Sequence, residues 1–211
     1  MTTPQYIISH DVGTSSNKAA LVDLDGNIKA YDTENYPIFY PQVNWAEQEP
    51  CYYWEAIVKT TRQVVEKAGV SPSDIIGMVF STQVLGIIPV GRNDEVLHRA
   101  IIWMDGRATK QAEQIMRKFG GRQVFAALVG TCITGKDGMA KLLWLKENEP
   151  EIYNKMECFL DVNGYLIFRA TGQKVFEWSC ASAFGFDLKK KDWMRMVLNY
   201  IGLDLNKFPR L

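Results

Sequence analysis

Apolar runs separated by small or polar residues at the start of the chain predict a β-meander. Residues 6–16 and 18–23 read as the two strands of a hairpin, joined by a turn that is rich in small hydroxyl residues. The dipeptide Asp25-Gly26 is typical of a tight turn and leads into a further strand, expected over 27–36. Three successive antiparallel strands should therefore open the chain.

A helix and a strand are expected next. Over residues 52–67, apolar or small residues recur at steps of three and four, which is the spacing of one helix face. Gly69 can end this helix, and residues 71–74 supply a turn. The following run, 75–81, is short and largely apolar, which is typical of a buried strand beside the first hairpin.

The second half of the chain is expected to be mostly helical. An extended pair at 86–90 and 97–103 precedes it, Asp192-Trp193 should begin a final helix toward Tyr200, and residues 203–211 read as a tail. The other expected helices cover 108–119, 123–128, 138–147 and 162–170, the last closed by Thr171-Gly172. A meander followed by alternating helices and strands predicts an α/β or mixed layered domain.

Composition narrows the class of protein. The chain has 211 residues, of which 47% are hydrophobic, so it can bury a substantial core as one domain or two. Its formal charge is zero and provides no basic field for nucleic acid, and the basic run 189–191 reads as a solvated turn. No segment approaches the roughly twenty apolar residues that cross a bilayer. We therefore expect a soluble, cytoplasmic protein that binds neither nucleic acid nor membrane.

Cysteine and histidine content argues against disulfides and zinc. The chain has two histidines and four scattered cysteines without Cys-x-x-Cys spacing, and it is far larger than typical disulfide-stapled domains. The cysteines are Cys51, Cys132, Cys158 and Cys180. Reduced thiols are therefore expected, and a structural zinc site is not.

The turn of the first hairpin has the composition of a phosphate-binding loop. Gly13 lets the backbone approach a ligand closely, while Thr14, Ser15 and Ser16 add hydroxyl donors beside backbone amides. Asp11 could hold Mg²⁺, which prefers a few carboxylate or water ligands together with phosphate oxygens. An ordinary hairpin with a polar tip is the competing interpretation. A Walker loop is excluded because the required Gly-Lys-Ser/Thr does not follow.

Several further strings, in order along nearly the whole chain, resemble the N-terminal half of the FGGY carbohydrate kinases, especially the xylulokinase-like members. The matching segments are 11–16 for the phosphate motif, 44–50 for the Trp-Ala-Glu-Gln element, 81–83 for a sugar-contacting strand end, 103–107 for Trp-x-Asp-x-Arg, 141–148 for a helical signature and 179–182 for the stretch after the catalytic carboxylate. The resemblance implies an actin-like, ribonuclease-H-like fold with a mixed central sheet flanked by helices.

The resemblance also implies a reaction, the transfer of a phosphoryl group from ATP to a hydroxyl of a sugar or polyol, with a pentulose such as xylulose favoured. Asp11 would hold Mg²⁺, and Gly13, Thr14, Ser15 and Ser16 would bind phosphate. The residues implied to bind the acceptor are Gln83, Val84, Trp103, Asp105 and Arg107. Glu177 would accept the hydroxyl proton.

Competing interpretations accompany these assignments. Asp105 and Arg107 could simply form an ion pair, and Trp45, Trp54 and Trp144 are expected to have structural roles. Helix 141–148 shows no more than an amphipathic pattern. In each of these cases the residue types alone do not require a ligand.

Departures from the family pattern bear on the substrate and the base. Val84-Leu85 stand where glycerol kinases carry Arg-Glu and xylulokinases commonly carry Met-His, which disfavours glycerol and leaves the sugar open. Gly138 replaces the usual Pro, Ser or Thr. Glu177 replaces an Asp, and its longer side chain would displace the carboxylate on a scale that can cost about a hundredfold in rate. Asp161 is an alternative base that no spacing favours.

Length limits the expected activity. Family members are about twice as long and have a second domain that provides most of the adenosine pocket, so residues 1–211 are expected to be the N-terminal domain, with a missing C-terminal kinase domain as partner. A non-catalytic sugar-binding or regulatory module is the alternative function. An actin-like assembly protein is a weaker one, and a homodimer stays open.

Overall fold

The computed structural model describes residues 5–211, which divide into two compact units. The sheet unit comprises residues 5–38 and 49–83, and the helical unit comprises 39–48 and 84–211.

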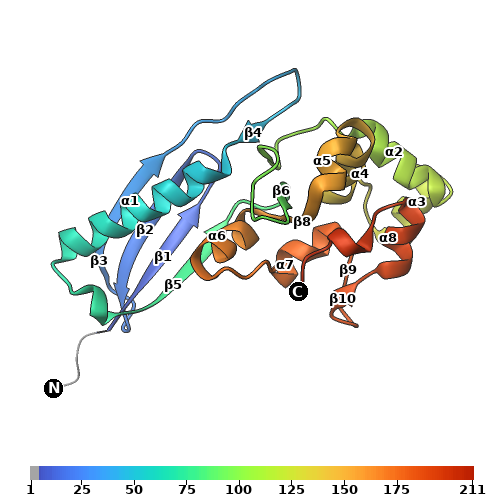
Figure 1. Ribbon diagram of the computed structural model, residues 1–211. Coiled ribbons are helices and arrows are strands. Elements are labelled where there is room, and N and C mark those ends of the chain that lie inside the picture. The colour runs from blue at the N-terminus through green and yellow to red at the C-terminus, as the bar shows by residue number, and fades with distance from the viewer. Residues whose placement is uncertain (1–4) are drawn as a thin grey trace. The chain divides into compact units, whose positions relative to one another are not determined.

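A four-stranded mixed sheet is the centre of the sheet unit (Figure 1). Its strands are β1 (Tyr6–Val12), β2 (Ser16–Asp23), β3 (Ile28–Asn35) and β5 (Ile75–Thr82), in the order β3-β2-β1-β5. The first three are antiparallel neighbours, which confirms the predicted meander, and β5 runs parallel to β1. Adjacent parallel strands place the ends of β1 and β5 at the same edge of the sheet.

Helix α1 (Pro50–Ala68) lies along one face of this sheet (Figure 1). It begins with a proline in its first turn and ends at Gly69, whose φ of 64° is the left-handed conformation expected there. Ile8, Leu21 and Val64 are fully buried between helix and sheet, so the apolar face predicted from the helical spacing forms the core of this unit.

Strand β5 differs from its sequence-based prediction. It follows a short 3₁₀ turn, η1 (Pro72–Asp74), and pairs with β1 as expected, but it is not buried. Ile76, Met78 and Val79 are 52%, 38% and 54% exposed. The reason is its edge position, since α1 packs chiefly on β2 and β3 and no strand in residues 5–211 pairs with the outer edge of β5.

The strands of the helical unit form short pairs. They are β4 (Glu47–Gln48) with β7 (Ala100–Ile101), β6 (Ile88–Gly91) with β8 (Met156–Leu160), and β9 (Phe186–Asp187) with β10 (Asp192–Trp193). The extended pair expected at 86–90 and 97–103 is only partly correct. These two segments meet at one isolated bridge, between Ile87 and Ile101, and β6 takes β8, a strand that was not predicted, as its main partner.

Helices make up most of the rest of this unit. They are α2 (Thr109–Lys118), α3 (Arg122–Val129), α4 (Gly138–Asn148), α5 (Pro150–Lys155), α6 (Val162–Thr171), α7 (Trp178–Ala181) and α8 (Arg195–Ile201), with 3₁₀ turns η2 (Ser182–Phe184) and η3 (Leu205–Lys207). Four of them, α2, α3, α4 and α6, confirm the predicted positions within two residues. The prediction that Asp192-Trp193 begins a helix is wrong, because these residues pair with β9 and the helix starts at Arg195.

An aromatic core holds the helical unit together and includes the predicted tail. Phe159, Phe176 and Phe184 are fully buried and in ring contact with one another. The indole N–H of Trp193 donates to the Pro209 carbonyl at 2.9 Å, so the last residues are packed against this core.

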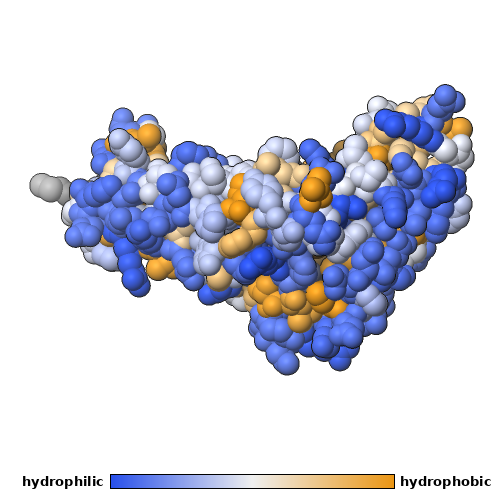
Figure 2. Space-filling model, turned by 90° about the horizontal axis from the view of Figure 1, so that it is seen from above, coloured by the Kyte–Doolittle hydropathy of each residue, from blue (hydrophilic) through white to orange (hydrophobic). Residues whose placement is uncertain are grey.

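On the face shown in Figure 2, hydrophilic residues predominate and hydrophobic ones gather in a few separate patches. Among residues 5–211, no helix combines the length and hydropathy of a membrane span.

Candidate functional site

The turn of the first hairpin is fixed by backbone hydrogen bonds. The Gly13 N–H donates to the Ser16 carbonyl at 2.9 Å, and the Tyr36 N–H donates to the Ser15 carbonyl at 3.1 Å. The Tyr36 hydroxyl donates to the Gly13 carbonyl at 2.6 Å. The end of β3 therefore supports the turn, a contribution that sequence reasoning did not identify because it depends on the register of three strands.

Gly13 is not required by the fold of this turn. A Cβ at this position would lie 3.5 Å from the Ser16 carbonyl oxygen, which is ordinary van der Waals contact, and the backbone is not in the left-handed region. An alanine would therefore fit in this turn. A glycine that packing does not demand is what close approach of a ligand to the backbone would explain.

Asp11 lies near the end of β1 with an exposed side chain. Its carboxylate forms an ion pair with Lys18 at 3.2 Å, and both side chains are about three-fifths exposed. Exposed pairs of this kind contribute little stability. The carboxylate is therefore accessible to a metal ion at small cost to the fold.

Gln83 lies at the same edge of the sheet as the turn. Its N–H donates to the Val12 carbonyl at 2.9 Å, because β5 runs parallel to β1 with Thr82 paired to Val12. Its side-chain amide donates to the Tyr53 hydroxyl at 3.3 Å. The structure thus brings the predicted phosphate turn and one predicted sugar ligand to the carboxyl ends of two parallel strands, where α/β sheets commonly bind ligands.

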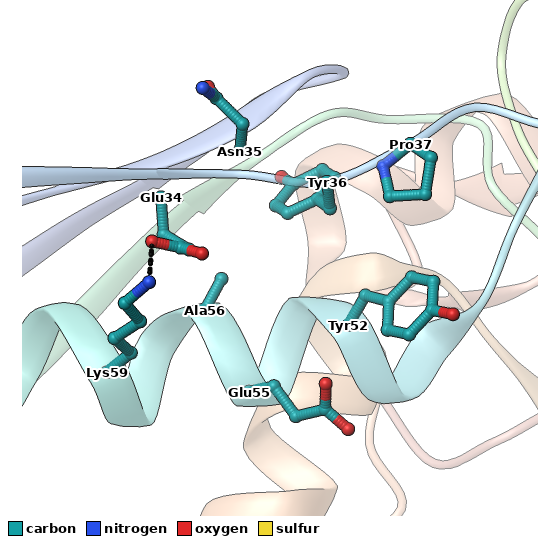
Figure 3. A pocket seen from close by; sticks show the side chains of 8 residues that line it. All are labelled: Glu34, Asn35, Tyr36, Pro37, Tyr52, Glu55, Ala56 and Lys59. Atoms are coloured by element: carbon teal, nitrogen blue, oxygen red, sulfur yellow. Dashed lines mark ion pairs between the residues drawn. The ribbon is translucent and has the colours of Figure 1, made fainter.

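A groove of about 360 Å³ lies between the end of β3 and the start of α1 (Figure 3). Glu34, Glu55 and Lys59 contribute its charged groups, and Lys59 pairs with Glu34 at 2.6 Å. Two carboxylates against one ammonium group make this groove unsuitable for phosphate. Tyr36 lines it as well and links it to the hairpin turn.

In the helical unit, Asp105 and Arg107 form the ion pair that was the alternative to substrate contact. The Arg107 guanidinium donates to Asp105 through Nη2 at 2.7 Å and Nε at 2.9 Å, and Nη2 also reaches Glu47 at 2.7 Å. Asp105 further accepts from the Ala46 N–H at 2.6 Å. Both side chains of the pair are fully buried. Their contact with a sugar stays a prediction.

Two tryptophan rings lie near the guanidinium group of this ion pair. The guanidinium of Arg107 lies 3.7 Å from the ring centroid of Trp45 and 4.9 Å from that of Trp144. Trp144 is buried, which confirms its predicted structural role. Arg107 Nη1 is buried without a hydrogen-bond partner in residues 5–211. Trp103, on the same segment as Asp105, is 40% exposed and therefore accessible to a ligand.

Lys141 is a buried charged residue that sequence reasoning treated as part of an amphipathic helix. Its ammonium group donates to the carbonyls of Leu85 at 3.0 Å and Ile102 at 2.7 Å. Burial lowers the pKa of Lys141 to about 7. The lysine therefore links the residue after Val84 to the residue before Trp103. The side chain of Val84 is itself half-exposed. A lysine within an otherwise apolar helix face was the only sequence signal of this.

Glu177, the predicted base, is the N-cap of α7. Its carboxylate accepts from the backbone N–H of Ser179 at 2.9 Å and of Cys180 at 3.2 Å, and from the Ser179 hydroxyl. Burial opposes ionisation of Glu177, but the hydrogen bonds from Ser179 outweigh it and the pKa is lowered. A base role for Glu177 stays a prediction.

Asp161, the alternative base, is also an N-cap. It is fully buried and accepts from the Gly164 N–H at 2.8 Å at the start of α6. Burial raises its pKa. The two carboxylates thus have opposite pKa shifts, and both have a structural task.

A profile of the "FGGY family of carbohydrate kinases, N-terminal domain" matches residues 6–211. Xylulose kinase from Bacillus subtilis (strain 168) is 30% identical over 208 residues, which cover 98% of this chain and 41% of that protein. Glycerol kinase from Thermococcus gammatolerans is 30% identical over 220 residues, covering 98% and 43%. The chain thus spans less than half the length of these relatives.

Solved structures agree with the sequence matches. Ligand-bound xylulose kinase from Lactobacillus acidophilus superposes with a TM-score of 0.86 at 27% identity and covers 98% of this chain and 41% of that chain. Gluconate kinase from the same organism gives a TM-score of 0.87 at 27% identity, with 98% and 42% covered. The predicted fold class, a mixed α/β fold of actin-like, ribonuclease-H-like type, is confirmed.

Proposed function

Because this chain belongs to the FGGY family of carbohydrate kinases, we propose that it is the N-terminal part of a kinase that transfers a phosphoryl group from ATP to a hydroxyl of a sugar or polyol. One observation carries the proposal. The hydroxyl-rich turn at 13–16, with a glycine that its own packing does not require, lies at the same sheet edge as Gln83. A pentulose such as xylulose is the acceptor we favour, since a xylulose kinase is among the relatives at 30% identity.

The residues of the turn fit ATP and Mg²⁺. A magnesium ion bound with ATP would neutralise phosphate charge, and Asp11 offers one accessible carboxylate for it, in keeping with the few protein ligands that Mg²⁺ takes. Gly13, Thr14 and Ser15 would contact phosphate oxygens through backbone amides and hydroxyls, with Ser16 closing the turn. Lys18, now paired with Asp11, is a cation beside this position.

The acceptor would be held by the residues that were predicted to bind it. Gln83 and Val84 follow β5, and Trp103 offers an exposed ring that can stack on the carbon face of a sugar. Asp105 and Arg107, already bonded to each other, would present a fixed array of polar atoms. Glu177 would accept the hydroxyl proton, and its lowered pKa would keep it ionised at neutral pH.

The second candidate function is a non-catalytic sugar-binding module of cytoplasmic location. The observation that favours it is the N-cap role of Glu177, whose carboxylate is occupied by Ser179 and Cys180 donors. A carboxylate that is needed to cap a helix is a weak choice for a mobile base. All four cysteines are free, in keeping with a reducing compartment.

The two functions are separated by a coupled ADP-release assay with a panel of pentuloses, polyols and hexonates, and by calorimetry with the same sugars. The chain is tested alone and joined to a C-terminal kinase half. Sugar-dependent ADP release that Gly13→Ala lowers at least tenfold supports the kinase. Sugar binding without ADP release in either form, unaffected by Gly13→Ala, supports the module and refutes the kinase.

A further inference from the structure

Lys141 has an unusual environment for a lysine. It lies in α4, its side chain is fully buried, and the other buried side chains of this helix are apolar. Its two hydrogen bonds go to the main-chain carbonyls of Leu85 and Ile102, and neither goes to a carboxylate. A buried ammonium group without a bonded counter-charge is costly, and an apolar side chain would fill the same space at lower cost. Packing alone therefore does not explain a lysine at this position.

The first of the two carbonyls belongs to a residue with a strained backbone. Leu85 has a φ of 61°, in the left-handed region that a leucine rarely adopts. Such conformations persist only where the surrounding structure holds them, and they gather at functional sites. The Lys141 ammonium group donates to the Leu85 carbonyl at 3.0 Å and so helps to hold this conformation. Leu85 directly follows Val84, which is one of the proposed acceptor ligands.

The second carbonyl begins the turn that carries Trp103 and Asp105. The Ile102 carbonyl accepts from Lys141 at 2.7 Å and from the Asp105 N–H at 3.0 Å. Because both bonds end on one oxygen atom, the ammonium group and this turn are fixed relative to each other. Lys141 is therefore bonded directly to the backbone that places Trp103 and Asp105.

The two segments are also joined by a main-chain bridge close to the lysine. Ile87 and Ile101 exchange both of their main-chain hydrogen bonds, each at 3.0 Å. The segments continue from this bridge toward Val84 and Trp103, and Lys141 bonds to both of them within the next two residues. The lysine is thus a second link between the segments, on the side of the bridge where the proposed acceptor ligands lie.

We propose that Lys141 is a positioning residue of the acceptor site, and that its ammonium group fixes the spacing between the segment of Val84 and the segment of Trp103 and Asp105. This inference rests on the proposed function for the nature of the site. Groups that contact one sugar from two segments must keep a set separation, and a displacement on the order of 1 Å can cost about a hundredfold in rate. Lys141 can set this separation without occupying the site, because it is itself buried.

Michaelis constants test the proposal. The C-terminal part of the B. subtilis xylulose kinase, the part beyond its match to this chain, is fused after Leu211, and the fusion is assayed with ATP and D-xylulose. Lys141→Met removes every N–H donor of the side chain and should raise the Michaelis constant for the sugar at least tenfold, while that for ATP changes less than twofold. The matched control is Lys146→Met on the same helix, since Lys146 also donates to a main-chain carbonyl, that of Gly202 at 2.6 Å, which belongs to neither segment. This control should change both constants less than twofold.

A purely structural lysine would give a different result. A partly unfolded enzyme contains fewer active molecules, so kcat falls while both Michaelis constants stay the same, and this pattern in Lys141→Met overturns the inference. If circular dichroism shows that Lys141→Met does not fold, Lys141→Gln takes its place. The glutamine side chain is shorter and can bond to only one of the two carbonyls, so the constant for the sugar should rise at least threefold. No rise overturns the inference, and so does a failure of both variants to fold.

The proposed function is judged separately from this inference. A wild-type fusion that releases no ADP with any sugar of the panel refutes the kinase, and calorimetry with the same sugars then decides the role of Lys141. A dissociation constant that Lys141→Met raises at least tenfold, and that Lys146→Met leaves within twofold, upholds the inference. Equal dissociation constants in wild type and Lys141→Met overturn it, and so does a wild type that binds no sugar.

Discussion

The buried ion pair of the helical unit gives the most quantitative prediction. Asp105→Asn removes one negative charge opposite Arg107, which the carboxylate contacts at 2.7 and 2.9 Å in a fully buried site. Glu47 remains as a second partner at 2.7 Å, so the guanidinium keeps part of its compensation. Breaking a buried pair costs about 3–5 kcal/mol, and we expect the lower end of that range. For a chain of this size about 3 kcal/mol lowers the melting temperature by roughly 6–12 °C.

The measurement is thermal unfolding of the isolated chain, followed by circular dichroism. The matched control is Asp11→Asn, which removes a carboxylate from an exposed pair with Lys18 and should change the melting temperature by less than about 2 °C. A fall below about 2 °C for Asp105→Asn would refute the reasoning, because the charge could not then be essential to a dry, paired site. A large fall for Asp11→Asn would show that exposure does not distinguish the two pairs.

Three further predictions address the candidate site. Gly13→Ala should leave the melting temperature unchanged or raise it, since the added methyl group has room and restricts the unfolded chain. The same change should lower turnover of the kinase at least tenfold. A destabilised chain with normal turnover would contradict this prediction. Glu177→Ala should lower the free energy of unfolding in urea by about 0.5–2 kcal/mol through loss of the N-cap, and Glu177→Gln should lower it less. If Glu177 is the base, both changes should abolish turnover. Near-normal turnover of Glu177→Gln would remove Glu177 from the mechanism. Burial depresses the pKa of Lys141 to about 7, so above that pH the folded state binds fewer protons than the unfolded state. The stability of the wild type relative to Lys141→Met should therefore rise by on the order of 1–3 kcal/mol from pH 7 to pH 9. A difference that stays constant over this range would refute the lowered pKa.

The elements that could be predicted are those whose signals are local. Turn residues and helical spacing determined the meander and α1, including its end at Gly69 in the left-handed conformation. The segment at Asp192-Trp193 resembles a helix start, but it pairs with Phe186-Asp187 only a few residues away. Pairing with Phe186-Asp187 outweighed the local helix signal at this segment, and the sequence does not show Phe186-Asp187 to be a strand.

The candidate site likewise combines features that are local in the sequence with features that depend on long-range contacts. The composition of the hairpin turn was visible in the sequence, but its support by Tyr36 depends on the pairing of three strands. The spacing of Asp105 and Arg107 allowed either an ion pair or a ligand site. The burial that makes the pair strong arises from Glu47 and Trp45, about sixty residues earlier in the chain. Long-range contacts of this kind leave no pattern within a short segment.

Strand β5 shows that a wrong prediction can still carry information about the molecule. Its apolar run predicted burial, and the isolated chain leaves it exposed at Ile76 and Val79. A nearly continuous apolar run is typical of a parallel strand that is buried on both faces, but periodicity within the run does not show whether a strand lies inside a sheet or at its edge. The charged edge at β3 excludes a general tolerance of apolar edges in this sheet. The exposure of β5 therefore comes from its edge position in the sheet, which its apolar run alone does not reveal.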